Sequence, residues 1–366
     1  NSDRRPKVSL WVVVGGQFGG EGKGKISAFI TRQEKIDICI RCGGPNSGHT
    51  LVAEDGNPIL LRQLPTGYIR PGTRLLIPAG ALIDLEVLKY ELDSLRLDPK
   101  RVGVDRNAMI IEQSDRDRES QLQLRDRLSS TLCGVGSAAA RRALRGADVK
   151  LAGKFALDVT WLADLITDVS EEANVALDSG KKVLVEGTQG FGLSLYHSDS
   201  YPKATSRDTT AAAFLSEVGL SPRLVTEIVL VLRTFPIRVS GQQAGPMKNE
   251  ITWEILRRES GYPHPIKEMT TVSKKVRRVG RFDWELVEKA VNTNKPTQLA
   301  INGLDYLNAR NRGAQLGELT WEARDFVAGL EKRTGTRCKI LGVGPSLGEI
   351  LLTRVESFSK SEMLPA

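Results

Sequence analysis

The chain has 366 residues, of which 40% are apolar and 26% charged, a composition typical of a folded globular protein and not of a disordered one. No apolar run approaches the roughly eighteen residues of a membrane-spanning helix, and residues 1–7 lack the apolar segment of a signal peptide. The four cysteines are too few for a disulfide scaffold, so we expect a cytoplasmic protein with no membrane partner. A net charge of +8 favours anionic partners, but only 5% of the residues are aromatic, and single-strand binders need aromatic side chains for stacking.

The first part of the chain predicts two buried strands, each followed by a glycine loop. Residues 9–14 form a short apolar run rich in β-branched residues, which leads into the glycine-rich segment 15–25 and then into a helix that includes 26–30. A second strand is expected at 36–40, followed by the loop 43–49.

The rest of the chain continues this alternation. Residues 54–58 have the turn chemistry of a hairpin between two apolar runs. Helical periodicity predicts one helix over 84–95, with an aspartate at its start, and a charged, solvated helix over 114–127. Further along we expect strands at 181–185, 224–232, 298–302 and 338–341, a helix at 319–332, and glycine loops at 186–192 and 342–346.

Strands that alternate with helices and end in glycine loops are typical of a largely parallel sheet that binds ligands at the carboxyl ends of its strands. No linker, repeat or low-complexity segment interrupts the pattern. The sequence therefore predicts the α/β class: a single large domain over residues 9–357, with a mostly parallel central sheet flanked by helices, insertions, and short tails at 1–8 and 358–366.

The loop at 15–25 presents free backbone N–H groups at the start of a helix, an arrangement that suits phosphate oxygens. It departs from the standard P-loop spacing, because Gln17 stands where that motif has its first glycine and Gly24 where it has a Ser or Thr hydroxyl. We interpret it as a phosphate-type loop of another kind; a tight turn without a ligand is the alternative.

Six segments along the chain carry recognisable motifs. They are Gln17-Phe-Gly-Gly-Glu-Gly-Lys-Gly-Lys25, Asn46-Ser-Gly-His-Thr50, Leu64-Pro-Thr-Gly67, Glu186-Gly-Thr-Gln-Gly190, Tyr201-Pro-Lys-Ala-Thr-Ser206 and Arg277-Arg-Val-Gly-Arg-Phe-Asp283. Together they resemble the signatures of the adenylosuccinate synthetase family, and the resemblance extends from residue 9 to about residue 347. It implies that family's fold and a ligase that uses Mg²⁺.

Three positions depart from the common family pattern. Gly20 stands in place of the catalytic aspartate, Lys275 in place of an arginine, and Gly303 in place of the lysine that covers guanine. These changes resemble the phage-type branch, the 2-aminoadenylosuccinate synthetases, which condense dGMP with aspartate on the route to 2-aminoadenine DNA. An ordinary adenylosuccinate synthetase that acts on IMP with GTP is the alternative.

The family reaction phosphorylates the purine O6, and the aspartate amine then displaces that phosphate. The loop aspartate of the IMP enzymes takes the N1 proton and helps to hold Mg²⁺, and a carboxylate at N1 lies beside C2, where guanine carries an amino group. Gly20 removes that carboxylate, so we expect a guanine nucleotide as substrate and a water or Glu21 as the proton acceptor. His49 is the group that the resemblance assigns to charge developing on O6.

The resemblance assigns the remaining site residues in groups. The catalytic group is His49, Gly20, Glu21 and Lys23, and the carbonyl of Gly48 contacts the metal. The nucleoside monophosphate is expected at Asn46, Thr131, Arg145, Gln189 and Thr205, and the substrate aspartate at Ser273, Lys275 and Arg277. The triphosphate is expected at Gly19, Gly22, Lys23, Gly24, Gly48, Thr50, Asp305, Gly342 and Gly344.

Two of these assignments have consequences for the partners. Arg145 aligns with an arginine that reaches the phosphate of the neighbouring subunit, which implies a homodimer; a solvated charge is the alternative. Asp305 aligns with the carboxylate that reads guanine in members that use GTP, but the phage-type branch uses ATP or dATP, and a carboxylate can also accept from the adenine amino group. We expect ATP or dATP as donor, with GTP as the alternative.

Two other classes of protein fit less well. Cys39 and Cys42 have the C-x-x-C spacing of a redox or zinc site, but no second pair follows and they end a strand, where their side chains point to opposite faces. A basic nucleic-acid-binding NTPase would need stacking aromatics and a Walker-type hydroxyl. We expect small-molecule substrates and no nucleic acid.

Overall fold

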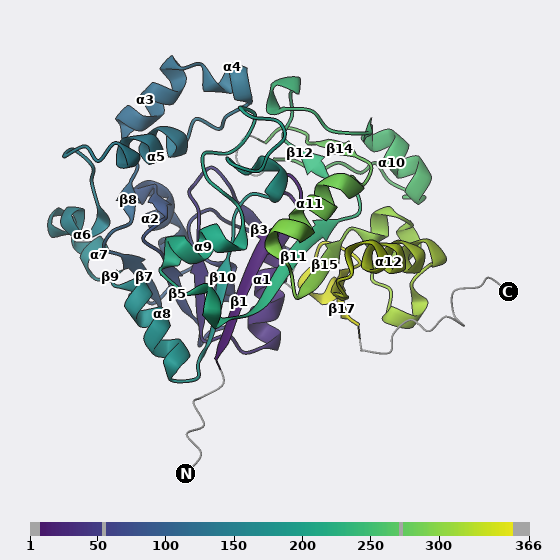
Figure 1. The fold of residues 1–366 in the computed structure, drawn as a ribbon, viewed down its shortest axis with the longest axis horizontal. Helices are drawn as coiled ribbons and strands as arrows, with labels where there is room; N and C mark the ends of the chain where they lie inside the picture. Colours follow the sequence, from purple (N-terminus) through teal and green to yellow (C-terminus); the bar gives the residue numbers. More distant parts are fainter. Residues whose placement is uncertain (1–7, 53–55, 271–273, 354–366) are drawn as a thin grey trace, which may run out of the picture.

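The computed structural model describes residues 8–52, 56–270 and 274–353, and it is organised around one ten-stranded sheet (Figure 1). All neighbouring strands in this sheet are parallel except the last pair, β16 and β17. In their order across the sheet the strands are β17 (Ile350–Leu352), β16 (Cys338–Gly342), β15 (Gln298–Asn302), β11 (Val225–Arg233), β1 (Ser9–Gly15), β10 (Lys182–Glu186), β2 (Ile38–Arg41), β5 (Arg74–Ile77), β7 (Val102–Asp105) and β9 (Ile166–Thr167).

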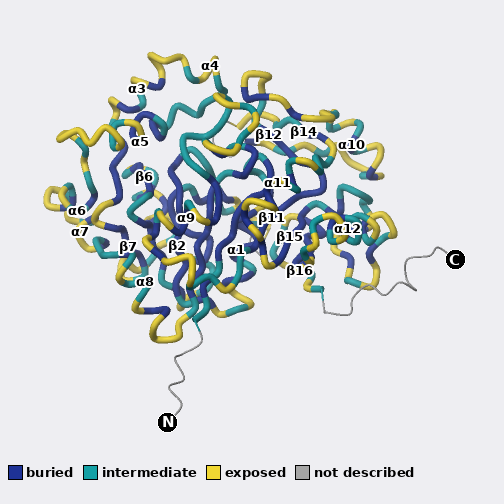
Figure 2. The backbone as a smooth tube through the Cα atoms, in the orientation of Figure 1, coloured by how far each residue is buried: buried dark blue, intermediate teal, exposed yellow. Residues whose placement is uncertain are grey.

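The central strands are apolar because helices cover both faces of the sheet. Side chains alternate between the two faces: Val12 and Val14 of β1 belong to one buried cluster, and Val13 belongs to another. One face packs against α8 (Val169–Asp178), α9 (Ala211–Val218), α11 (Trp284–Asn294) and α12 (Trp321–Thr334); the other packs against α1 (Lys23–Gln33), α2 (Leu85–Ser94), α6 (Ala152–Phe155) and α7 (Thr160–Ala163). Figure 2 shows the resulting buried interior along the sheet.

Smaller elements lie around the sheet. Figure 1 shows α3 (Gln113–Gln121), α4 (Leu124–Leu128) and α5 (Val135–Ala143) together above the β7 edge. A three-stranded antiparallel sheet lies beyond the other half and contains β12 (Ile237–Arg238), β14 (Arg278–Gly280) and β13 (Glu250–Ile251), with α10 (Trp253–Ser260) beside it. The remaining pairs are the hairpin β3 (His49–Val52) and β4 (Pro58–Leu61), and the short pair β6 (Leu82–Ile83) and β8 (Met109–Ile110).

The predicted fold class is confirmed, and two element predictions need correction. The predicted helix over 114–127 is two helices, because Gln123 adopts a left-handed φ of 53° between α3 and α4. The helix after the glycine loop begins at Lys23, inside the segment predicted as loop. The 84–95 helix is confirmed, with the Asp84 side chain accepting hydrogen bonds from the N–H groups of Glu86 and Val87.

Some predictions fall partly on residues that the structure does not describe. The predicted turn at 54–58 overlaps 53–55, and the predicted end of the domain at residue 357 lies beyond residue 353. Within the described ranges, no helix combines the length and the apolar character needed to span a bilayer.

Candidate active site

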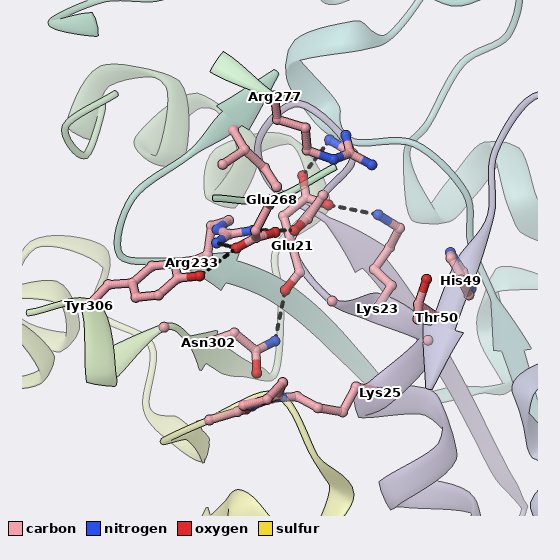
Figure 3. Close-up of a pocket in the computed structure, with 18 of the residues that line it drawn as sticks. Glu21, Lys23, Lys25, His49, Thr50, Arg233, Glu268, Arg277, Asn302 and Tyr306 are labelled. Carbon is pink, nitrogen blue, oxygen red and sulfur yellow. Dashed lines mark hydrogen bonds and ion pairs between the residues drawn. The ribbon is translucent and has the colours of Figure 1, made fainter. Parts of the chain in front are cut away.

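Three of the glycine loops (15–25, 43–49 and 342–346) and several strand ends meet at one cavity of about 490 Å³ (Figure 3). Strands β1, β2, β10, β11, β15 and β16 run parallel, so their carboxyl ends lie along the same edge of the sheet. Cations and anions both line the cavity, with more of the former. The lining residues are Gly19, Gly20, Glu21, Gly22, Lys23, Gly24, Lys25, Gly48, His49, Thr50, Arg233, Ile237, Lys267, Glu268, Met269, Arg277, Asn302, Gly303, Asp305, Tyr306, Arg312, Gly344 and Pro345.

The first glycine loop is held in shape by Glu21. Its Oε1 atom accepts hydrogen bonds from the N–H groups of Gln17, at 3.0 Å, and Gly19, at 2.8 Å. Its Oε2 atom pairs with Nζ of Lys23 at 2.7 Å, and both side chains are buried. These contacts occupy both carboxylate oxygens, an arrangement that favours an anchoring role for Glu21 over that of a free base.

Two glycines of this loop have conformations that other residues rarely adopt. Gly19 has a φ of 91° and Gly22 a φ of 88°. Gly24 is required for a different reason, because a Cβ atom at this position would lie 2.5 Å from Cβ of His49. The loop and the start of α1 therefore lie tightly against the His49 strand.

His49 belongs to a buried polar network at the ends of β2 and β10. Its Nδ1 atom contacts both the Glu186 carboxylate and the Arg41 guanidinium, and Arg41 Nη1 lies 2.9 Å from Glu186 Oε1. The second oxygen of Glu186 accepts from the N–H and hydroxyl of Thr66, at 2.8 and 2.7 Å. Burial, helped by the charge of Arg41, lowers the pKa of His49 to about 4, so the imidazole is neutral at pH 7.

A second cluster lies at the ends of β11 and β15, and its members Arg233, Glu268 and Tyr306 were not predicted from the sequence. The Arg233 guanidinium pairs with Glu268 and donates to the carbonyl of Gly20 at 2.9 Å. Tyr306 donates its hydroxyl proton to the same carboxylate at 3.0 Å, while Arg277 donates from Nε to the carbonyl of Met269 (Figure 3). Glu268 and Arg277 come from one chain segment, so this cluster ties the glycine loop to the segment expected to bind aspartate.

The third part of the cavity contains Lys25 and Asp305. Burial lowers the pKa of Lys25 to about 8, although Asp305 and Glu349 oppose the shift, and its Nζ atom donates to the carbonyl of Gly344 at 2.7 Å. Tyr262 donates its hydroxyl proton to Asp305, and burial raises the pKa of this carboxyl.

The structure brings most of the predicted site residues together. Those that line the cavity are Gly19, Gly20, Glu21, Gly22, Lys23, Gly24, Gly48, His49, Thr50, Arg277, Asp305 and Gly344. Gly342 lies beside it: a Cβ atom there would lie 3.0 Å from Nζ of Lys25. Gln189 packs against the first loop, close to Gly19.

The other predicted residues do not line this cavity. Asn46, Thr131 and Thr205 are half-buried in loops outside it, and Lys275 and Arg145 are exposed. Ser273 lies outside the described residues. Lys25, Arg41, Arg233 and Glu268 were missed as site residues. Lys25 could have been predicted, because it is the last residue of the glycine-loop motif. The other three come from segments that match no recognised motif.

A mostly parallel sheet, a phosphate-type loop and cations at the strand ends define a nucleotide-binding α/β enzyme. A family model described as adenylosuccinate synthetase matches residues 12–161 and 150–312. The adenylosuccinate synthetase of Thermococcus sibiricus is 39% identical over 346 residues, covering 93% of this chain and 97% of that protein. That of Methanocaldococcus jannaschii is 39% identical over 355 residues, covering 95% and 98%. The chain belongs to the adenylosuccinate synthetase family.

Solved structures agree with this assignment. The fully ligated adenylosuccinate synthetase of Plasmodium falciparum has the same fold, with a TM-score of 0.84 at 21% identity, and covers 95% of this chain and 100% of that one. Cyanophage S-2L succinoaminodeoxyadenylate synthetase (PurZ), bound to dGMP and to dATP as an energy donor, matches with a TM-score of 0.80 at 28% identity, covering 95% and 96%. The chain is thus a C–N ligase of the type that condenses aspartate with a purine nucleotide.

Proposed function

We propose that the purine nucleotide is dGMP and that the product is 2-aminoadenylosuccinate. In this reaction ATP or dATP phosphorylates O6 of the guanine, and the amine of L-aspartate then attacks C6 and expels that phosphate. The observation that carries the proposal is Gly20, which lines the cavity where the family has a catalytic aspartate. Without that carboxylate, no acidic side chain from position 20 lies beside C2, where guanine carries its 2-amino group.

The neutral state of His49 fits its proposed role. A neutral imidazole carries one proton: Nδ1 holds it when it donates to the Glu186 carboxylate, and Nε2 holds it when Nδ1 accepts from Arg41. The proposed role uses the second tautomer, in which Nε2 donates to the purine O6 as negative charge develops there. Because the loop already occupies both oxygens of Glu21, a water is favoured over Glu21 as the acceptor of the N1 proton.

Other cavity residues fit the two further substrates. Arg277, half-buried at the cavity wall, is the candidate for a carboxylate of aspartate, with Lys275 beside it in the chain. Lys23, Lys25 and the N–H groups of the loop are candidates for the triphosphate. For the base of the triphosphate, Asp305 offers a hydrogen-bond acceptor. Gly303 stands where the family has the lysine that covers guanine, so no side chain from this position covers the base.

The family requires Mg²⁺, and the cavity fits an ion delivered with the triphosphate. The described residues contain no group of three or more His, Cys, Asp or Glu side chains that could cage a metal. Mg²⁺ often takes most of its ligands from substrate phosphates and water, and the carbonyl of Gly48 would complete that set. The bound ion would polarise the transferred phosphoryl group.

The curated relatives favour a second candidate. Those from Thermococcus and Methanocaldococcus carry the name adenylosuccinate synthetase and are more similar in sequence to this chain than the phage enzyme is. An IMP- and GTP-using enzyme is therefore the alternative. The homodimer and the cytoplasmic location remain parts of the proposal.

A substrate matrix separates the two candidates. Purified protein is incubated with aspartate, Mg²⁺ and each of dGMP, GMP, dIMP and IMP, paired with ATP, dATP or GTP, and the succino-nucleotide product is measured. We expect the highest kcat/KM for dGMP with ATP or dATP. A higher value for IMP with GTP would establish the ordinary reaction instead.

A further inference from the structure

The place that a Cβ atom of residue 20 would occupy is not empty, because the side chain of Ile237 fills it. A Cβ atom built on Gly20 would lie 2.6 Å from both Cγ1 and Cδ1 of Ile237, closer than real Cβ atoms come to other atoms. Gly20 itself has no left-handed φ, unlike its neighbours Gly19 and Gly22. Space, and not backbone conformation, therefore excludes a side chain at position 20.

Ile237 has little freedom to move away. It is 2% exposed, lies on β12 and pairs with Val279 of β14. Its side chain belongs to a buried cluster with Phe235, Leu256 and Val279. A β-branched side chain has few alternative rotamers, and a close-packed cluster resists any shift.

Ile237 also lines the substrate cavity, as Gly20 does. The strand that carries it lies far from the glycine loop in the sequence, and the two approach each other where Arg233, four residues before Ile237, donates to the carbonyl of Gly20. Ile237 thus forms an apolar part of the cavity wall. It lies where the Cβ atom of the family's catalytic aspartate would be.

We propose that Ile237 is a specificity-determining residue that acts as a pair with Gly20. While Ile237 holds this place, an acidic side chain at position 20 cannot adopt a working position, so the chain cannot gain the IMP reaction by a change at position 20 alone. The identification of IMP and dGMP as the competing substrates rests on the proposed function, whereas the steric pairing of Gly20 with Ile237 does not.

The steric pairing is tested by stability, without any substrate. Thermal unfolding is measured for wild type, Gly20→Ala, Ile237→Ala and the double variant. We expect Gly20→Ala to lower Tm, and this shift to fall by at least half in the Ile237→Ala background, because the smaller side chain makes room for the added methyl. Additive shifts would overturn the pairing.

The specificity role is tested by activity. We expect Gly20→Asp alone to show no gain in kcat/KM for IMP, and Gly20→Asp/Ile237→Ala to exceed it at least tenfold. Gly20→Asp/Val279→Ala is the matched control: it enlarges the same cluster at a residue that does not line the cavity, and it should not rescue.

Two activity results would overturn the specificity role: Gly20→Asp aminating IMP as well as the double variant does, or the double variant showing no gain. If wild type instead prefers IMP to dGMP, the proposed function fails. The stability measurements would still decide whether Gly20 and Ile237 are paired.

Discussion

At the scale of single residues, Lys25 has an unusual charge state for a lysine. It is 6% exposed, and burial lowers its pKa to about 8 against the opposing effect of Asp305. It is mostly protonated at pH 7 and mostly neutral at pH 9. If its charge helps to bind the triphosphate, the affinity for the donor must fall as pH rises through 8.

We therefore predict that kcat/KM for the triphosphate falls about tenfold per pH unit above pH 8 in wild type. In Lys25→Arg the value should be lower at pH 7 but nearly constant up to pH 9.5, because a guanidinium keeps its charge. Initial rates at subsaturating donor, measured from pH 6.5 to pH 9.5, give both profiles. The same decline in both proteins would assign it to another group.

The residue scale also shows where sequence reasoning reaches the site and where it stops. Gly19, Glu21 and His49 were predicted because each lies in a short motif that forms its own loop. Arg233 and Glu268 are 35 residues apart and meet only because β11 and the segment before β14 end at the same cavity. Ile237 looks like any core isoleucine in the sequence, and its contact with the loop follows only from the tertiary fold.

At the scale of the element, the glycine loop depends on one carboxylate. Glu21 ties the N–H groups of Gln17 and Gly19 to the charge of Lys23 inside a buried site. The glycine loop at 186–192 presses against the same carboxylate, since a Cβ atom at Gly190 would clash with Glu21 Oε1 and with Gln17 O. The two loops therefore share one anchor.

We predict that Glu21→Gln costs on the order of 3 kcal/mol of unfolding free energy, because it leaves the buried Lys23 without a charged partner. We also expect KM for the triphosphate to rise more than kcat falls, since the loop that binds phosphate loosens. Chemical denaturation and steady-state kinetics measure the two effects.

Glu91→Gln is the matched control for this prediction. Glu91 is a buried carboxylate that accepts from the N–H groups of Gln63 and Leu64, away from the cavity. The Glu91→Gln variant should have a lower free energy of unfolding, with little change in KM for the triphosphate. If Glu21→Gln instead lowers kcat at unchanged KM and stability, Glu21 is the proton acceptor and not the anchor.

The element scale also explains which strands could be predicted. Strands β1, β10, β11 and β15 were predicted from mostly apolar runs, whose central residues are buried on both faces of the sheet. Strands β5, β7 and β9, the last three at one side of the sheet, contain four, four and two residues and were not predicted. Segments so short carry no periodicity, and only pairing with a neighbour makes them strands.

At the scale of the whole molecule, the proposed homodimer depends on Arg145. This residue is exposed at the end of α5, beside Leu144, which is 81% exposed, and it does not line the cavity of its own chain. In the proposed homodimer it contacts the phosphate of a nucleotide bound by the neighbouring chain, across the interface. In a two-fold dimer each site would then combine His49 of one chain with Arg145 of the other.

This arrangement predicts complementation between two inactive variants. His49→Ala and Arg145→Ala dimers should each be nearly inactive. In a mixed dimer, one site receives both substitutions and the other receives neither, so random subunit exchange at equal concentrations should restore about a quarter of wild-type activity. Rates before and after exchange, with differently tagged chains to quantify the mixed dimer, test it. If mixed dimers form and no activity returns, Arg145 does not act across the interface and is a solvated charge.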